Sequence, residues 1–480
     1  MKRFLLLILS LMMLLPAISG CKGHSATPGS KSTDDRTAAG SYKADYLPDS
    51  DFDGYLFRLV DCEADITHFD EDSADAMHSA MYRRDALLES RYNFEFTSKT
   101  VASYDLMTTE FYTNAMSQSD NFDLCKLIMR DAFLMATEGY VTPAEALPYC
   151  DITQDWYIHD VNEQLSINNR LWFAYSDECT GAYLGTLMIF FNKTIADDLK
   201  LGNLYDMVDN GTWTVDRFYD FAAKAKQDIN EDGYSINNGE DRFGVICEND
   251  TFLASIWIGS GELTVRKDSD DFPYFAALGN EKLYGIVEKL FGFYHGDGNV
   301  YDGFRDDKVA VETYTKDIGL FANGRALFMP SGLVNMSSLG SMNDDFGMLP
   351  LPKYNEEQEN YYSRLMDGWI NTVPSSNTDL SRTSIIMESM AVETKNLVYP
   401  AYLNSAMENK YLRDDESRKM IDLAQERRIV DLGDTIWMVP VRTTMLAIFN
   451  KNTCQVDSTI SSMKDVINET IRKGTEGLDY

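Results

Sequence analysis

The stretch GYLFRLVDC at residues 54–62, read together with FEFTSK at residues 94–99, decides the fold class. Both stretches are short and rich in aromatic and aliphatic residues, which predicts β-strands. Between them, Ser73 to Arg91 mixes alanine and leucine with charged residues, as expected of a surface helix. A strand, a helix and a second strand in this order predict an α/β layer architecture.

The following residues continue the alternation. We predict a helix over 104–117, a strand over 122–129 and a short helix over 132–138. Apolar strands that alternate with amphipathic helices favour a mostly parallel sheet covered on both faces. Ligands collect at the carboxyl ends of such strands, so Arg130 and Asp131 are expected at the edge of a site.

The rest of the chain continues the alternation of predicted strands and helices. Thr214 is a good N-cap for one of the later helices, and Val466, Ile467 and Ile471 are expected on one side of the last helix. The predicted strands are 185–192, 242–247, a strand ending near Pro330, and 347–352, and the predicted helices are 195–200, 215–228, 251–258 and 458–473.

The N-terminus has the pattern of a secretion signal. Lys2 and Arg3 precede an apolar stretch that is shorter than the roughly 20 residues needed to span a bilayer. The tetrapeptide Ile18-Ser19-Gly20-Cys21 resembles the lipobox of bacterial lipoproteins. We therefore expect residues 1–20 to be removed and Cys21 to carry the lipid that anchors the protein to the outer face of the cell membrane.

Residues 21–51 are rich in small and polar residues and are expected to form a flexible, lipid-anchored tether. The remaining chain of about 430 residues exceeds what one hydrophobic core usually serves, which predicts two lobes.

The net charge disfavours two classes of binding partner, whereas the cysteine spacing leaves the disulfide state open. A net charge of −33 disfavours nucleic acid and anionic lipid, so the only expected membrane contact is the anchor. Apart from Cys21 there are six cysteines, without CxxC or zinc-type spacing. In an exported chain they are either disulfides or buried thiols.

A series of short motifs carries a resemblance to a known family. In order they are LPYCDITQDWYIHDVNEQLSINNRLWFAYSD (147–177), FNK (191–193), NGTWTVDRFYDFAAKAKQD (210–228), NGRALFMPSG (323–332), FGMLPLPKYNEEQENYYS (346–363) and NTVPSSNTDLSRTSIIMESMA (371–391). Taken in this order, they resemble family 1 extracellular solute-binding proteins of ABC importers, the group that includes maltose-binding protein.

The resemblance implies an α/β, two-lobed clamshell of the type II periplasmic-binding-protein kind, with a ligand cleft between the lobes. The chain would cross between lobes three times, with one lobe at 52–177 plus 367–430 and the other at 178–366 plus 431–480. Closure on a solute, expected to be a sugar or oligosaccharide, would then be read by the permease subunits of an ABC transporter. The expected protein is a monomer, needs no cofactor and is not an enzyme.

Sugars offer hydroxyls and flat apolar faces, so their sites pair polar side chains with aromatic rings. Trp369 lies at a predicted lobe crossing and Trp257 follows a predicted strand, and each is either a cleft residue or core. Trp213 is expected to pack beneath the helix that it precedes. The polar candidates have helix-capping or loop hydrogen bonds as their alternative role. These are Asp131, Tyr183, Glu248, Ser331 and Asn335.

Asp228, Asn230 and Asp232 followed by Gly233 resemble the opening of an EF-hand calcium loop. The closing carboxylate of that motif is one place late, at Glu240. The two interpretations are a structural calcium site and an acidic turn that binds nothing.

Two other functions compete with solute import. The first is a secreted carbohydrate-active enzyme, although HExxH and GxSxG motifs are absent from the sequence. The second is a binding lipoprotein that reports to a membrane sensor, which uses the same capture step.

Overall fold

A computed structural model describes residues 42–62, 68–69, 75–236, 241–303, 313–365, 368–408 and 411–478. All of them belong to one compact unit, Ala39–Tyr480. The predicted signal peptide and Cys21 lie outside the described residues, so the predicted cleavage and lipidation stay predictions.

The first sheet has the strand order β12-β3-β1-β2. Strand β1 (Tyr55–Cys62) pairs in parallel with β2 (Phe94–Val101) and β3 (Leu124–Ile128). Strand β12 (Trp369–Thr372) returns from far along the chain and lies antiparallel to β3. The sheet is mostly parallel, as predicted, because helices join β1 to β2 and β2 to β3.

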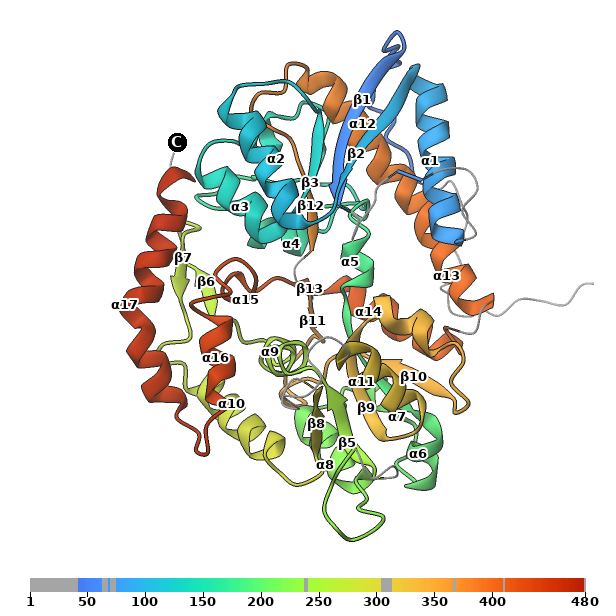
Figure 1. The fold of residues 1–480 in the computed structure, drawn as a ribbon, viewed down its shortest axis with the longest axis vertical. Coiled ribbons are helices and arrows are strands. Elements are labelled where there is room, and N and C mark those ends of the chain that lie inside the picture. The colour runs from blue at the N-terminus through green and yellow to red at the C-terminus, as the bar shows by residue number, and fades with distance from the viewer. Residues whose placement is uncertain are drawn as a thin grey trace, which may run out of the picture. The chain divides into compact units, whose positions relative to one another are not determined.

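Helices α1 (Ala76–Tyr92) and α2 (Tyr104–Met116) make these connections, and α12 (Leu380–Glu393) packs beside α1 (Figure 1). The Asp75 carboxylate caps α1 by accepting hydrogen bonds from two backbone amides of its first turn. Ser103 caps α2 in the same way. Each capping side chain fixes where its helix begins.

The second sheet has the strand order β10-β4-β9-β5-β8. Its strands β5, β8 and β9 run parallel, whereas β4 lies antiparallel to both β9 and β10. This sheet is therefore mixed, which the expectation of mostly parallel sheets missed. Every residue of β4 is buried, and an apolar run buried on both faces carries no information about strand direction. The strands are β4 (Leu187–Asn192), β5 (Phe243–Cys247), β8 (Val300–Asp302), β9 (Ala326–Gly332) and β10 (Phe346–Leu349).

Trp213 packs beneath helix α8 (Val215–Ala225), as predicted. The ring is fully buried and its Nε1 donates to the Pro350 carbonyl at 2.9 Å. Thr214 caps α8 through its hydroxyl, which accepts from the Arg217 amide at 3.4 Å. Thr214 therefore fixes where α8 begins, and Trp213 fills the space beneath it.

Three segments carry the chain between the two sheets (Figure 1). The first leads from β3 to β4, the second from β10 to β12, and the third from α13 (Tyr399–Glu408) to α14 (Asp415–Glu426). Strand β11 (Ser363–Arg364) on the second segment pairs in parallel with β13 (Arg428–Ile429), which follows α14. Helix α14 packs on β10 of the second sheet, although the predicted lobe ranges assign it to the first. Those ranges stay a prediction.

Residues at the end of the predicted tether are part of the packed body. The Tyr42 amide donates to Asn396, and the Tyr46 hydroxyl donates to the buried carboxylate of Glu388. The packed body therefore includes Tyr42, nine residues before the predicted limit at Asp51, because its ring lies against a buried hydrophobic cluster.

The C-terminal helix α17 (Val456–Thr475) buries Ile467 and Ile471, as predicted. Val466 was expected beside them, but its side chain is 63% exposed. The reason is periodicity, because Ile467 and Ile471 are four residues apart and share one face, whereas Val466 falls outside that stripe.

The remaining elements complete the layers around the two sheets. They are α3 (Met129–Thr137), η2 (Ala144–Ala146), α4 (His159–Gln164), α5 (Gly181–Leu184), α6 (Lys193–Asp198), α7 (Leu204–Asp209), α9 (Asn249–Gly259), β6 (Val265–Lys267), β7 (Pro273–Phe275), α10 (Glu281–Tyr294), α11 (Thr313–Ala322), η4 (Leu333–Leu339), η5 (Thr394–Val398), α15 (Leu432–Thr435), α16 (Arg442–Ile448) and η6 (Glu476–Leu478).

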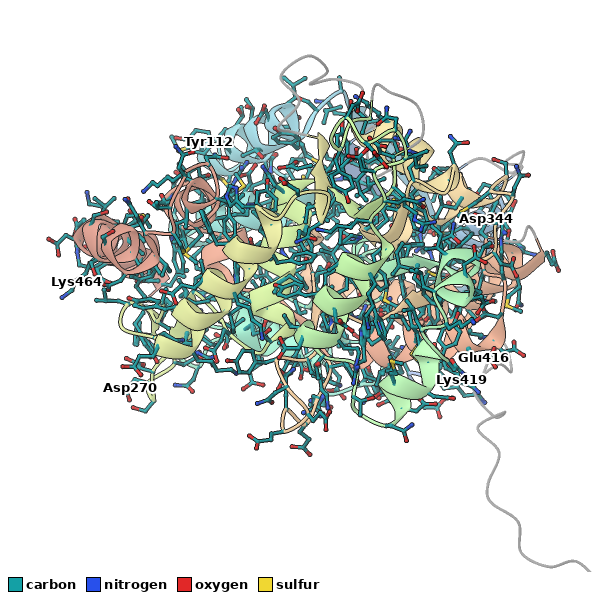
Figure 2. The ribbon with its side chains drawn as sticks, turned by 90° about the horizontal axis from the view of Figure 1, so that it is seen from below. Tyr112, Asp270, Asp344, Glu416, Lys419 and Lys464 are labelled. Carbon is teal, nitrogen blue, oxygen red and sulfur yellow. The ribbon has the colours of Figure 1, made fainter. Side chains whose placement is uncertain are left out.

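The six cysteines of the described chain are all free thiols, which settles the alternative left open by their spacing. Cys125 and Cys247 are buried, and burial raises the pKa of both thiols. No helix within the described ranges is long and apolar enough to span a bilayer. Figure 2 shows the labelled side chains of Asp270, Glu416 and Lys464 at the rim of the view, with acidic and basic groups interspersed.

Candidate ligand site at the strand ends

A cavity of about 130 Å³ lies where β5 and β9 end. These two strands are parallel, so their carboxyl ends meet at one edge of the second sheet, which is where α/β proteins bind ligands. Its apolar wall includes Leu187, Ile318, Met329 and Val334, and its polar side chains are Glu248, Thr251, Asp317, Ser331 and Asn335.

Three of the predicted ligand residues come together at this cavity. Glu248 follows β5 directly, Ser331 lies near the end of β9, and Asn335 follows in η4. The Asn335 amide donates to the Ser331 hydroxyl at 2.6 Å. This bond holds both side chains at the cavity wall.

Asp317 in α11 is the group that the sequence analysis missed. Its side chain is 4% exposed, and neither carboxylate oxygen has a hydrogen-bond partner among the described residues. An acidic residue within the apolar face of a helix is the signal that would have found it, since Ile318 and Phe321 beside it are also buried. Thr251, at the start of α9, was missed as well.

Both carboxylates at the cavity hold their protons more tightly than free side chains do. Burial, followed by the charges of Asp250 and Asp302, raises the pKa of Glu248 to about 7. Burial, followed by the charges of Glu248 and Asp302, raises the pKa of Asp317 to about 8. The carboxyl edge of the second sheet is therefore a place where negative charges lie close together in a low dielectric.

The first sheet places two predicted residues at the corresponding strand end. Asp131 lies in the first turn of α3, directly after β3, and is 6% exposed. Its two oxygens accept from the Thr108 hydroxyl and from Arg130 Nε, each at 2.7 Å. Trp369 is half-buried and pairs with Ile128 at the end of β3.

Trp369 also lies close to the first crossing segment. A Cβ atom placed on Gly181, at the start of α5, would be 3.5 Å from the Trp369 ring. The indole therefore borders the segment that leads from the first sheet to the second.

Two other predicted ligand residues are enclosed by protein. The Tyr183 ring stacks on Tyr399 with centroids 4.1 Å apart, and Arg428 lies over its face at 5.7 Å. Trp257 is 1% exposed in α9 and does not line the cavity at the strand ends. The structure therefore separates Trp257 from Glu248, although both follow the same strand.

The acidic loop brings together a different set from the predicted one. The carboxylates of Asp228, Asp232 and Asp241 have ligand atoms within 4.8 Å of one another. Asp241 was not predicted, and Glu240 lies outside the described residues. The Asn230 side chain accepts a hydrogen bond from the Asp232 amide at 3.3 Å.

Asp241 holds the loop from the start of β5. Its two oxygens accept from the amides of Ile229 and Ser235, and these bonds lower its pKa. Asp228 Oδ2 accepts from the Gly233 amide at 2.9 Å, whereas Oδ1 is buried and has no hydrogen-bond partner in the part of the chain that the structure describes. The donor set is all oxygen, which fits a hard cation such as Ca²⁺.

Comparison with known proteins identifies the fold. No family model and no curated protein sequence matches the chain. Among solved structures, the GacH receptor of Streptomyces glaucescens, solved unliganded and with acarbose, is 13% identical over 89% of this chain and 99% of its own, with a TM-score of 0.56.

Two further structures agree. The sugar-binding protein MalE of Xanthomonas citri is 15% identical over 87% of this chain and 98% of its own, with a TM-score of 0.58. MalE of Bdellovibrio bacteriovorus, bound to maltotriose, is 12% identical over 87% of this chain and 100% of its own, with a TM-score of 0.53. The chain, with its two mixed sheets, therefore has the fold of the MalE-like solute-binding proteins, as its resemblance to family 1 predicted.

Proposed function

We propose that this chain is an extracellular, lipid-anchored solute-binding protein that captures a sugar or oligosaccharide and delivers it to the permease of an ABC transporter. A fold hosts many functions, so the proposal is argued from the site. The observation that carries it is that both sheets present ligand-type side chains at strand ends. Glu248, Asp317 and Ser331 line the cavity of the second sheet, and Asp131 and Trp369 lie at the end of β3 in the first.

In this proposal, the two halves of the protein close around the bound solute. Three segments join the two sheets, and β11 on the second of them pairs with β13, which follows α14. A few residues at such crossings absorb the backbone change when two halves close on a ligand. A solute that contacts both halves favours the closed state by its difference in affinity for the two states.

Scattering and thermal denaturation test this proposal together. The mature chain is screened against a glycan library that includes maltotriose, and each glycan that raises the melting temperature is then added in small-angle X-ray scattering. A ligand at 100 times its Kd stabilises by about 2.7 kcal/mol, and the radius of gyration is expected to fall. No stabilisation by any glycan would reject carbohydrate as the solute, and stabilisation without compaction would reject closure.

The lipid anchor is tested separately through Cys21. Replacing Cys21 with Ser removes the thiol that would carry the lipid, so the protein is expected to move from the membrane fraction to the medium. Replacement of a cysteine of the folded body, such as Cys454→Ser, is the matched control and is expected to leave the protein with the membrane.

The competing functions predict other outcomes. A carbohydrate-active enzyme would release sugar from the glycan that stabilises it, which chromatography of the incubated mixture detects. A sensor would bind the same glycan but would not support uptake. Loss of radiolabelled solute uptake on deletion of the gene, restored by the intact chain, would distinguish import from sensing.

We further propose that the acidic loop binds Ca²⁺ in a structural role. The support is the oxygen-only set of Asp228, Asp232 and Asp241, together with the buried, unpartnered Oδ1 of Asp228. Calcium is expected to raise the melting temperature of the wild type but not of Asp228→Asn. A melting temperature that does not respond to calcium chloride or to chelator would reject the site.

A further inference from the structure

Two acidic side chains, Glu248 and Asp317, line the cavity at the strand ends and hold their protons more tightly than free carboxyl groups do. Within the described chain, neither Asp317 nor Glu248 forms an ion pair with lysine or arginine, and both oxygens of Asp317 lack a hydrogen-bond partner. Lys316 is adjacent in sequence, and its ammonium lies over the Tyr301 ring at 5.9 Å. Leaving a buried carboxylate without a counter-charge costs several kcal/mol, so the cavity must take up a proton or a cation.

A neutral hydroxyl can bind only while the two carboxyl groups keep their protons, because it brings no charge to replace them. A protonated amine supplies a full positive charge and up to three donors, so it can take the place of those protons beside two carboxylates that line the same cavity. An ammonium group is therefore the solute group that these side chains select over a hydroxyl.

The size and lining of the cavity agree with this choice. A volume of about 130 Å³ equals roughly four water molecules, so the cavity has room for an amine with its attached carbon. The lining also includes the apolar side chains of Met329 and Ile318. Ser331 and Asn335, which are hydrogen-bonded to each other, line the cavity as well.

We propose that this cavity is a cation subsite that binds a protonated amine of the solute, so that the preferred guest is an amino sugar rather than a neutral one. The inference rests on the proposed function, because it assigns a chemical class to the solute of the same site. In the unliganded chain a proton occupies the place of the ammonium, which is consistent with the raised pKa of both carboxylates.

Matched pairs of sugars test the proposal without any variant. Isothermal titration of the mature chain compares glucosamine with glucose and with uncharged N-acetylglucosamine, and the glucosamine disaccharide with cellobiose. We expect the amine-bearing member of a pair to bind at least tenfold more tightly. Equal affinities within every pair would overturn the subsite and leave the proposed function standing, whereas no binding of any carbohydrate would overturn both.

The Asp317→Asn variant keeps the shape of the side chain and removes its charge. We expect it to lose the preference for the amine at least tenfold while its affinity for the neutral partner stays the same. Asp220→Asn makes the same change on the exposed face of α8 and is expected to behave as wild type. An amine preference that survives Asp317→Asn and Glu248→Gln would overturn the assignment.

Proton competition gives a second measurement on the wild type. Glu248 and Asp317 must lose their protons to bind the amine, under the influence of the charges of Asp250, Asp302 and Lys316. Affinity for glucosamine is therefore expected to rise at least fivefold from pH 5.5 to pH 7, whereas affinity for glucose stays constant. Calcium chloride serves as the last probe. If the wild type binds Ca²⁺ tightly, Asp317→Asn abolishes that binding and no amine preference is found, the proposal is overturned in favour of a metal site.

Discussion

At the carboxyl edge of the second sheet, the pKa of an acidic side chain depends on the residues that surround it. Asp317 is an ordinary acidic residue in sequence, but α11 places it in a cavity with Glu248 and away from water. Burial is the first cause of its raised pKa, and the like charges of Glu248 and Asp302 add to it. The same residue on an exposed helix face would be ionised at neutral pH.

The pH dependence of the free energy of unfolding tests whether burial raises the pKa of Asp317. Folded Asp317 keeps its proton up to a pH of about 8, whereas the ordinary pKa of 3.8 applies in the unfolded chain. The folded state therefore binds more protons between these values, and the free energy of unfolding falls as pH rises. In urea denaturation at pH 5 and pH 8, Asp317→Asn is expected to show a smaller fall than wild type.

Asp220→Asn is the control, because it makes the same change on the exposed face of α8, where Asp220 pairs with Lys224 away from the cavity. Parallel falls in wild type and Asp317→Asn would show that the carboxyl group is already ionised at pH 5.

At the scale of elements, the crossing segments are held by buried charges. Arg364 of β11 is fully buried, and its guanidinium donates to both oxygens of Asp434 in α15, at 2.7 and 2.8 Å. A third guanidinium nitrogen donates to the Asp250 carbonyl at 2.7 Å. One side chain therefore ties the second crossing to α15 and to the start of α9.

Removing either partner of this pair takes away the closest counter-ion of a buried charge, although Arg442 also lies 3.9 Å from Asp434. Arg364→Gln and Asp434→Asn are each expected to cost about 3–5 kcal/mol in the free energy of unfolding. Because the two side chains share one interaction, the double variant should be at least about 1 kcal/mol less destabilised than the sum of the singles. Additive losses in chemical denaturation would show that the pair is not coupled.

The contact between α8 and β5 depends on a glycine. A Cβ atom on Gly244 would lie 2.5 Å from the Ala222 carbonyl oxygen and 2.8 Å from that of Asn299. Both obstacles are backbone, so Gly244→Ala forces the helix off the strand and is expected to destabilise by at least about 1–3 kcal/mol.

Gly285 in α10 provides the matched control. Nothing lies within 4 Å of a Cβ atom built there. Gly285→Ala is expected to stabilise by about 0.4–1 kcal/mol, because alanine loses less conformational freedom on folding. Similar melting temperatures for the two variants would contradict the close packing at Gly244.

At the scale of the whole molecule, one hydrophobic cluster continues from the first sheet to the second. It includes Leu127 of β3, Tyr175 of the first crossing segment, Leu187 of β4 and Phe328 of β9. Elements that share a continuous core are expected to unfold together. The two sheets therefore belong to one cooperative unit even though they carry separate strand orders.

Thermal unfolding followed by two probes tests this expectation. Far-ultraviolet circular dichroism reports on both sheets and their helices, and fluorescence is dominated by tryptophans, of which Trp213 and Trp257 are buried around the second sheet. The two midpoints are expected to coincide. A fluorescence transition several degrees away from the dichroism transition would show that the sheets unfold independently.

The sequence by itself determined the order of elements, several helix starts and the fold class. These depend on local features, such as the Thr214 cap and the apolar runs of β1 and β4, which act within a few residues. It also placed Glu248, Ser331 and Asn335 at strand ends, because a residue that follows a strand in this architecture lies near the sheet edge.

Only the tertiary structure decided the direction of β4, the burial of Asp317 and Trp257, and the closing of the acidic loop by Asp241. Each depends on partners far apart in sequence. The residues of a buried apolar strand do not indicate whether it pairs in parallel or antiparallel. An acidic residue becomes buried only where other elements exclude water from it. Those contacts come from packing, which no local pattern encodes.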